Sequence, residues 1–410
     1  MLIPVAGSVV VVGGGPGGVL LTYLLARAGV EVTLLEARGD FARRFRGDTL
    51  APGVLEYLDT LGLAEDLLSD IPHTRSDAFR WHTPERVYTL VDYRGASRRF
   101  PYYALIPQAE FLPWLARRAV ELGARVEMGA RFSDLRSDAD GRRAGVDYTV
   151  GVGTRTRDAT LVVGADGRSS KVRAAAGIAA TELGASLDLL WFALDRDPAD
   201  PSFSGLDLFS RPGGTLALLD QGGQWQLGWS VAAGTFDAVR DAGVGPLVDA
   251  VDAQLPWLAP RLRAALTQVN QLTLLPVRIT TVEAWSRPGL LLLGDAAHVM
   301  SPVGGNGINL ALADAAEAAN LLVGPLLDGA RPEDVDAAAA RLEPRRRPAV
   351  EREQRRQVRT ERAAARRNRG DDPRPPAVLR VLAAVPGLPR LLGARSGVRV
   401  PAPVPAIGAG

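Results

Sequence analysis

Cysteine is absent from this chain of 410 residues, and only three histidines occur. Without cysteine there is no disulfide framework, no thiolate nucleophile and no iron–sulfur cluster. No two of the histidines (His73, His82 and His298) have the spacing of metal ligands, so we predict no metal site. The chain also lacks a G-x-S-x-G motif, which argues against serine hydrolase chemistry. The chemistry of such a protein must therefore come mainly from a cofactor.

Long apolar runs are missing as well, since no stretch reaches the roughly 20 residues of a membrane-spanning helix. The apolar start, residues 2–12, lacks a basic flank and runs directly into a glycine loop, so we interpret it as a strand and not as a signal peptide. We expect a cytoplasmic protein without stable membrane association. The net charge of +2 is small for this length and gives no argument for a nucleic-acid partner.

The N-terminus carries the pattern of a dinucleotide site. A β-branched run at 9–12 is followed by GGGPGG, in which three glycines have the G-x-G-x-x-G spacing: Gly13, Gly15 and Gly18. A helical pattern at 20–28 and a strand pattern at 31–36 complete the unit. The first glycine makes the turn, the second admits the pyrophosphate and the third lets the helix pack on the sheet. Glu36, at the strand end, can accept hydrogen bonds from a ribose and would repel a 2′-phosphate, which favours the adenosine of FAD or NAD.

A second glycine-rich loop occurs late in the chain, where residues 294–309 read GDAAHVMSPVGGNGIN. It follows a buried-strand pattern at 290–293, and a helical pattern begins near Asn309. Glycine lets a backbone approach a flat ligand closely because no Cβ stands in the way. The free N–H groups of the new helix favour negative charge or an electron-rich carbonyl edge. Asp295, at the strand end, could hold a sugar hydroxyl.

Three features lie between these loops. Arg46 belongs to a loop with two further arginines, where it could reach a pyrophosphate in a bidentate way or form part of a solvated cluster. Gln108 precedes a helical pattern and could donate to a cofactor, or be an ordinary exposed glutamine. Residues 162–167 read VVGADG, another apolar strand that ends in an acid and a glycine, Asp166 and Gly167.

Residues 185–285 differ in pattern from the segments that flank them, because short strand patterns are separated there by glycine and proline. Aromatic side chains alternate along residues 79–103 in the same way. We predict a mostly antiparallel sheet that covers the cofactor. Tryptophans in such a sheet belong more often to the core than to a pocket, so we expect this of Trp191, Trp225 and Trp229.

Three motifs in this order, GGGPGG, GADG and GDAAHVMSPVGGNGIN, resemble those of the class A flavoprotein monooxygenases, the para-hydroxybenzoate hydroxylase-like family. The resemblance covers roughly residues 7–325. It implies that FAD is held by residues at the positions of the family motifs: Gly13, Gly15, Gly18, Glu36, Arg46, Gln108, Asp166, Gly167, Asp295, Gly307 and Asn309. It further implies that Pro302, Gly304 and Gly305 belong to the loop that packs on the isoalloxazine.

The family's chemistry implies an NADPH- or NADH-dependent reaction in which reduced flavin and O2 form a C4a-hydroperoxide that oxygenates an electron-rich substrate. No tyrosine pair in the substrate segment matches the phenol-activating residues of the para-hydroxybenzoate enzyme. The aromatic middle of the chain suits a large apolar substrate, such as an aromatic polyketide in natural-product tailoring. Two alternatives stay open: a cyclase of the same fold that keeps FAD but has no net redox reaction, and a non-enzymatic flavin- or ligand-binding protein.

The arginine-rich segment 341–370 predicts a long polar helix, solvated across the back of the molecule, with a surface for anionic partners or substrates as the alternative. Residues 371–376 predict a linker, and residues 377–392 an apolar segment that docks on the fold or touches a membrane surface. The tail at 401–410 predicts disorder.

The expected fold is α/β, with a Rossmann-type FAD-binding domain, a mostly antiparallel substrate domain and a C-terminal helical segment. We assign residues 1–75, 104–182 and 286–330 to the first, residues 76–103 and 183–285 to the second, and residues 331–410 to the third. A homodimer is the assembly that we expect if the protein associates.

Overall fold

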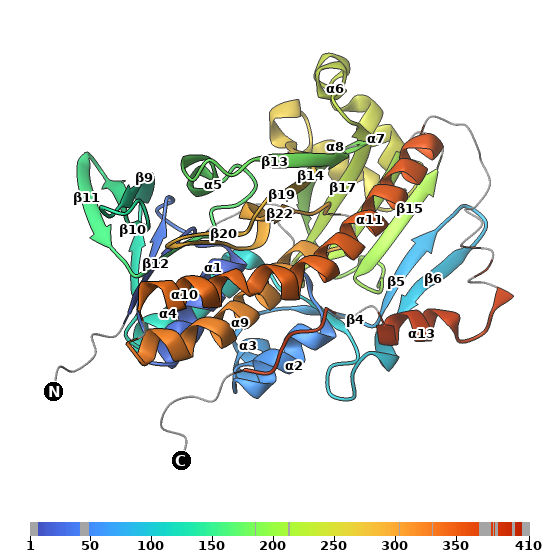
Figure 1. Ribbon diagram of the computed structural model, residues 1–410. Coiled ribbons are helices and arrows are strands. Elements are labelled where there is room, and N and C mark those ends of the chain that lie inside the picture. Colours follow the sequence, from blue (N-terminus) through green and yellow to red (C-terminus); the bar gives the residue numbers. More distant parts are fainter. Residues whose placement is uncertain are drawn as a thin grey trace.

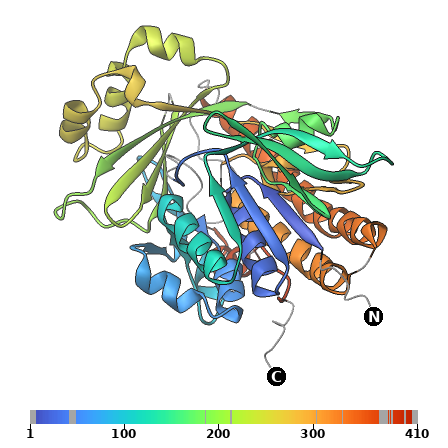
Figure 2. The same cartoon turned by 90° about the vertical axis from the view of Figure 1, so that its left-hand side faces the viewer.

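The computed structural model describes residues 7–41, 49–184, 186–211, 214–302, 304–329, 331–368, 379, 381, 384–395 and 398–403. Two large sheets organise this part of the chain, and helices cover them on their outer faces (Figures 1 and 2). This mixture of a Rossmann-type half, an antiparallel half and C-terminal helices confirms the α/β class expected from the sequence.

The first sheet has six strands, in the order β20-β21-β12-β1-β2-β8. Their bounds are Ser286–Arg287 (β20), Leu290–Leu292 (β21), Leu161–Gly164 (β12), Ser8–Val12 (β1), Glu31–Glu36 (β2) and Arg125–Met128 (β8). All neighbours are parallel except β20 and β21. The register pairs Val9 with Leu161 on one side and with Val32 on the other. These strands are nearly continuous apolar runs because a parallel sheet is covered on both faces.

Helices cover one face of this sheet. The helices nearest to it are α1 (Pro16–Arg27), α4 (Gln108–Glu121) and α9 (Asn306–Leu327), with α1 packed between the other two. By length and composition alone α9 could cross a membrane, but 78% of its apolar window is buried inside the fold. It is a core helix of this domain. The smaller helices of this half are α2 (Pro52–Thr60), α3 (Ala64–Asp70), α5 (Lys171–Ala175) and α10 (Pro332–Ala340).

Three small sheets complete this half of the molecule. One packs on the other face of the first sheet and consists of β9 (Ala130–Ser137), β10 (Arg143–Val150) and β11 (Gly153–Asp158). The second consists of β3 (Thr49–Leu50), β7 (Tyr103–Leu105) and β4 (Thr74–Ser76). The third consists of β13 (Ala180–Gly184), β19 (Ile279–Val282) and β22 (His298–Val299).

The second large sheet has seven strands in the order β18-β14-β17-β16-β15-β5-β6. Their bounds are Thr273–Pro276 (β18), Leu187–Asp195 (β14), Gln224–Ala232 (β17), Gly214–Asp220 (β16), Leu206–Arg211 (β15), Ala78–His82 (β5) and Val87–Asp92 (β6). Only β15 and β5 are parallel to each other. Two segments far apart in sequence, 78–92 and 187–276, therefore share one sheet. Side chains alternate between its faces, so each strand contributes to two environments.

One face of the second sheet packs against three helices: α6 (Phe236–Ala242), α7 (Gly245–Asp252) and α8 (Ala259–Ala265). Trp225 and Trp229 are buried in this core, as expected for tryptophans of the sheet. Trp191 differs, because its side chain lies with Leu189 and Val277 on the other face. Three short 3₁₀ turns connect elements of the fold, η1 (Tyr93–Gly95), η2 (Val269–Gln271) and η3 (Gly294–Ala296).

The C-terminal helices join the two halves. Helix α11 (Leu342–Asn368) follows α10, contacts α9 and extends to β17 of the second sheet (Figure 1). Helix α13 (Leu388–Arg395) lies against β6 and η1. The predicted docking of segment 377–392 holds for two of its described parts, since Leu379 is fully buried and α13 packs on the fold. Four apolar side chains of the segment are exposed: Val381, Val385, Leu391 and Leu392. The predicted linker at 371–376 lies outside the described residues.

Candidate active site

A cavity of about 1000 Å³ lies between the two large sheets, and most of the predicted site residues line it. Its first wall is formed by the glycine turn before α1, the residues after β12, and the loop and helix from Leu293 to Ala311. Its second wall is the inner face of the seven-stranded sheet. Helix α11, Leu379 and Leu392 of α13 complete the lining. One cavity thus connects the glycine motifs with the predicted substrate sheet.

The glycine turn between β1 and α1 leaves no room for side chains. Gly13 has a φ of +109°, and a Cβ on it would lie 2.4 Å from the carbonyl oxygen of Ala165. A Cβ on Gly18 would lie 2.1 Å from the carbonyl oxygen of Gly13. The turn is therefore packed against both its own helix and the strand β12. Gly15 is the N-cap of α1, and neither a side-chain cap nor an acidic residue in the first turn competes for its N–H groups. Such a helix start suits a phosphate.

Glu36 stabilises this turn from the end of β2. It is only 4% exposed, and its Oε2 accepts a hydrogen bond of 2.7 Å from the backbone N–H of Gly14. Its Oε1 accepts one of 3.0 Å from the N–H of Arg38. Glu36 and Gly13 do not line the cavity itself. The predicted contact of Glu36 with a ribose stays a prediction.

The residues after β12 form the second part of the first wall. Asp166 caps α5, because its carboxylate accepts from the backbone N–H groups of Lys171 at 2.7 Å and Val172 at 3.1 Å. Gly167 follows with a φ of +87°, and both residues line the cavity. Arg173 of α5 donates to the carbonyl oxygen of Ala296 at 3.0 Å. This bond ties the GADG segment to the late glycine loop.

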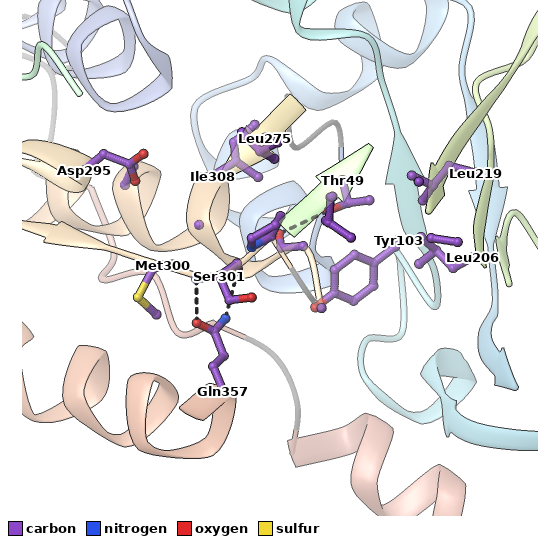
Figure 3. Close-up of a pocket in the computed structure, with 18 of the residues that line it drawn as sticks. Thr49, Tyr103, Leu206, Leu219, Leu275, Asp295, Met300, Ser301, Ile308 and Gln357 are labelled. Carbon is purple, nitrogen blue, oxygen red and sulfur yellow. Dashed lines mark hydrogen bonds between the residues drawn. The ribbon is translucent and has the colours of Figure 1, made fainter. Parts of the chain in front are cut away.

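The late loop contributes its backbone and small side chains to the cavity. The predicted loop residues in the lining are Asp295, Pro302, Gly304, Gly305 and Gly307. Figure 3 shows Asp295, Met300, Ser301 and Ile308 around this part of the cavity. Asn309 is different, because it is fully buried and its amide binds backbone groups. It accepts from the N–H of Ala51 at 2.8 Å and donates to the oxygen of Thr49 at 2.9 Å. These bonds tie α9 to β3, whereas the predicted cofactor contact stays a prediction.

Gln108, the first residue of α4, is buried and lines the cavity. Arg46 lies outside the described residues.

Helix α11 was expected to be solvated across the back of the molecule, and for one face this is wrong. Four of its polar residues are buried: Arg346, Gln354, Gln357 and Glu361. Gln357 exchanges two hydrogen bonds with the backbone of Ser301, accepting from the N–H at 2.9 Å and donating to the oxygen at 3.2 Å (Figure 3). The spacing of the uncharged or acidic residues at 354, 357 and 361 marked this face within the arginine-rich segment. Helical periodicity applied to polar residues could have found it.

A buried ionic network lies below the late loop. His298 Nε2 is 2.6 Å from one oxygen of Asp314, and Arg346 Nε donates to the other at 2.8 Å. Burial by itself raises the pKa of Asp314, but the charges and hydrogen bonds of His298 and Arg346 outweigh it and leave the pKa lowered. The network joins β22, α9 and α11, so it fixes the loop relative to the C-terminal helix.

A tyrosine pair, which sequence reasoning did not find, lines the cavity. The rings of Tyr93 and Tyr103 lie with centroids 4.4 Å apart, and both residues are buried. Burial raises the pKa of both hydroxyls, so they are neutral hydrogen-bond donors at neutral pH. The two come from η1 and β7, elements that only the fold brings together. In Figure 3 the Tyr103 hydroxyl is directed to the side on which Ser301 lies.

The sheet wall is mostly apolar. Its lining residues include Trp81, Leu187, Leu189, Trp191, Leu206, Leu208, Leu219 and Leu275. A Cβ on Gly228 would lie 2.7 Å from the indole of Trp191, so this glycine lets the ring lie flat against β17. Gln221 and Gln226 add polar groups and are joined by a hydrogen bond of 2.7 Å. A broad apolar surface with few polar groups suits a flat hydrophobic ligand.

Comparisons with known proteins agree with this geometry. A family model described as FAD binding domain matches residues 7–353. The 6-methylpretetramide 4-monooxygenase of Streptomyces rimosus is 34% identical over 366 residues, which are 86% of this chain and 82% of that protein. The dialkyldecalin synthase of Streptomyces rugosporus is 30% identical over 322 residues, and there the chain spans only 63% of the relative.

The fold is also similar to solved structures. The crystal structure of PqsL, a probable FAD-dependent monooxygenase from Pseudomonas aeruginosa, matches with a TM-score of 0.74. The match covers 89% of this chain and 98% of that one, at 21% sequence identity. At this identity the likeness concerns the fold alone.

Proposed function

The chain belongs to the family of FAD-dependent monooxygenases that share this FAD-binding domain, and from this membership we propose that it oxygenates an aromatic, polyketide-like small molecule in natural-product tailoring. FAD is the cofactor, NADPH or NADH the electron donor and O2 the oxygen source, as is general for the family. The observation that carries the proposal is the continuous cavity, which joins the glycine motifs to a broad apolar sheet.

The residues around the first wall fit FAD. The turn has space only for backbone at Gly13 and Gly18, as close approach of a pyrophosphate requires. We propose that Glu36 and Arg46 hold the adenosine and pyrophosphate, and that Gln108, Asp166, Gly167, Asp295, Gly307 and Asn309 position the remainder. We propose that Pro302, Gly304 and Gly305 face the isoalloxazine. When bound, FAD supplies the redox chemistry and the activation of O2.

The protein's own side chains have the task of orientation and water exclusion. The apolar sheet wall excludes water from the reacting edge of a substrate, which strengthens polar interactions within the cavity. The hydrogen bonds of Gln357 fix the backbone at Ser301, directly before Pro302. A fixed loop holds the cofactor and the substrate in one relative geometry. The name of the Streptomyces rimosus relative, a 6-methylpretetramide 4-monooxygenase, supports a polycyclic substrate of this kind.

The test is a spectrum of the purified, FAD-loaded protein before and after anaerobic NADPH or NADH, with polycyclic phenols present. We expect the flavin absorbance to bleach faster with at least one phenol, and ¹⁸O from ¹⁸O2 to enter the product. A product without oxygen from O2 would refute the proposal.

The dialkyldecalin synthase relative favours one second candidate, a cyclase that keeps the flavin without net oxidation. This candidate predicts turnover in the absence of NAD(P)H and no ¹⁸O in the product. The same experiment therefore separates the two functions.

We also propose a cytoplasmic location, which the burial of the apolar helix α9 supports. The homodimer stays a prediction, and light scattering of the purified protein tests it by measuring the molar mass in solution.

A further inference from the structure

One helix of the cavity wall carries two guanidinium groups nearly one turn apart. Arg356 and Arg359 both belong to α11 and both line the cavity. Residues three apart on a helix share a face. From this arrangement we propose that Arg356 and Arg359 bind an oxyanion of the substrate, so that the substrate is an acidic phenol or enol bound as its anion. The inference rests on the proposed function and names the chemical class that this site selects.

Arg356 has a fixed orientation before any ligand binds. Its Nε donates to Oε2 of Glu353 at 2.8 Å, and its second terminal nitrogen donates to Oε1 at 2.6 Å. Glu353 itself accepts from the side-chain amides of Asn306 at 2.8 Å and Gln357 at 3.3 Å. This pairing uses two of the five N–H donors of the guanidinium, so three remain. A side chain that is already ordered loses little entropy when a ligand binds.

The position of Arg356 places these donors where a substrate meets the late loop. A Cβ on Gly304 would lie 3.6 Å from a terminal nitrogen of Arg356. The charge of Arg356 also acts on the hydroxyls of both Tyr93 and Tyr103. Neither hydroxyl has a hydrogen-bond partner within the part of the chain that the structure describes. An anionic oxygen at this point would therefore meet a guanidinium and two neutral hydroxyl donors.

The two arginines differ in their partners on α11. Glu353 compensates Arg356, whereas Arg359 has no carboxylate partner among the described ranges. Arg359 is exposed and lines the cavity, so its guanidinium can contact an anion that binds there. The ligand that fits is a flat apolar body with one anionic oxygen at its edge. Its binding releases the hydroxyl proton to water and moves no electrons. The resulting anion is richer in electrons at its ring carbons, which favours oxygen transfer to them.

The experiment uses the FAD-loaded protein and two flat three-ring probes, 2-hydroxyanthraquinone and 2-methoxyanthraquinone. The phenol changes colour when it ionises, so its absorbance reports both binding and charge. We expect the wild type to bind the phenol at least tenfold more tightly than the ether and to hold it as the anion at a pH where the free phenol is largely protonated. Charge-assisted hydrogen bonds of this kind account for about tenfold in affinity each.

Variants assign the effect to residues. Arg356→Gln and Arg359→Gln should each weaken phenol binding roughly tenfold and leave ether binding unchanged. Arg356→Lys keeps the positive charge but lacks the planar, bidentate guanidinium, so it should retain part of the affinity for the phenol. Arg355→Gln is the matched control, because Arg355 lies on the same helix, does not line the cavity and, among the described residues, pairs with Glu351 at 3.3 Å.

Two results would overturn the inference. One is a wild type that binds both probes equally. The other is an Arg356→Gln variant that loses both probes equally, because this would mean that Arg356 only supports the loop through Glu353. Oxygen incorporation is measured separately. A protein that binds the anion but incorporates no oxygen would refute the proposed function and leave the oxyanion site in place.

Discussion

The two walls of the cavity are built by different means. The first wall consists mainly of backbone: glycine turns, helix starts and strand ends whose geometry depends on residues close together in the sequence. The second wall and its surroundings consist of side chains from seven strands, two C-terminal helices and a tyrosine pair. Local patterns therefore describe the first wall well and the second poorly. The difference also implies that the first wall tolerates few substitutions, while the second can change its specificity by single side chains.

The largest effect is expected at the glycine turn. Gly18→Ala places a Cβ about 2.1 Å from the carbonyl oxygen of Gly13, so the turn must open. We expect at least a hundredfold loss of FAD affinity, which corresponds to roughly 2.7 kcal/mol. Fluorescence titration with FAD measures this. Gly324→Ala is the control, because this glycine lies on α9 with nothing within 4 Å of the added Cβ. Equal FAD binding by both variants would contradict a backbone-built site.

The next effect concerns the ionic network that joins the two walls. Asp314→Asn removes the buried partner of His298 and Arg346, which should lower the free energy of unfolding by about 3–5 kcal/mol. Urea denaturation at pH 7 measures the loss. Glu351→Gln, which removes a partly exposed carboxylate of α11, is the control and should change the free energy of unfolding by less than about 1 kcal/mol.

The pH dependence of this network has a definite sign. Because the pKa of Asp314 is lowered in the folded state, its stabilisation is present above the unfolded value of about 4 and is lost as the pH falls through the folded value. The wild type should therefore lose stability in acid more steeply than Asp314→Asn. If the free energy of unfolding falls with pH equally in both proteins, this assignment is wrong.

A smaller effect is expected where α11 holds the late loop. Gln357→Ala removes two hydrogen bonds to the backbone of Ser301, which should lower the free energy of unfolding by about 1–3 kcal/mol. Substrate-stimulated reduction of the flavin should also slow, while FAD affinity changes little. Stopped-flow absorbance under anaerobic conditions measures the rate. An unchanged rate together with reduced stability would mean that the contact is structural only.

The smallest effect is expected for a change in the second wall, the inner face of the seven-stranded sheet. Gly228→Ala places a Cβ 2.7 Å from the ring of Trp191 and should push the indole into the cavity. We expect a roughly threefold to tenfold rise in the Kd of a polycyclic ligand, about 1 kcal/mol, with no change for FAD. Ala217→Gly, which enlarges the same wall, is the comparison variant. A loss of FAD affinity in Gly228→Ala would mean that the two walls do not bind their ligands independently.

The glycine motifs predicted the fold class and the family because their function depends on local backbone geometry. Gly15, Gly18, Asp166, Gly167, Asp295 and Pro302 line one cavity although up to 287 positions separate them. Gly15, Asp166 and Asp295 follow β1, β12 and β21, which are neighbouring parallel strands of one sheet, and a sequence reveals this rule of topology. Pro302 follows β22 of another sheet and reaches the cavity through the late loop. The roles of these residues toward FAD remain predictions that the variants above test.

The position of α11 could not be predicted from local sequence patterns. Its composition is that of an exposed helix, and most of its arginines are indeed exposed. The buried face is polar, with Gln354 and Gln357 bonded to backbone groups of β19, β22 and the late loop. A hydrophobic pattern cannot indicate such a face, because its stabilisation comes from hydrogen bonds to partners more than 50 residues away.

The sequence by itself determined the first wall, since glycine spacing and strand-end acids act within a few residues of one another. Only the tertiary structure decided the second wall. Tyr93, Tyr103 and Arg356 come from three elements with no common motif, and they lie together because η1, β7 and α11 pack around one cavity. Long-range packing is set by the whole core and not by local pattern, so no local motif could place these three residues together.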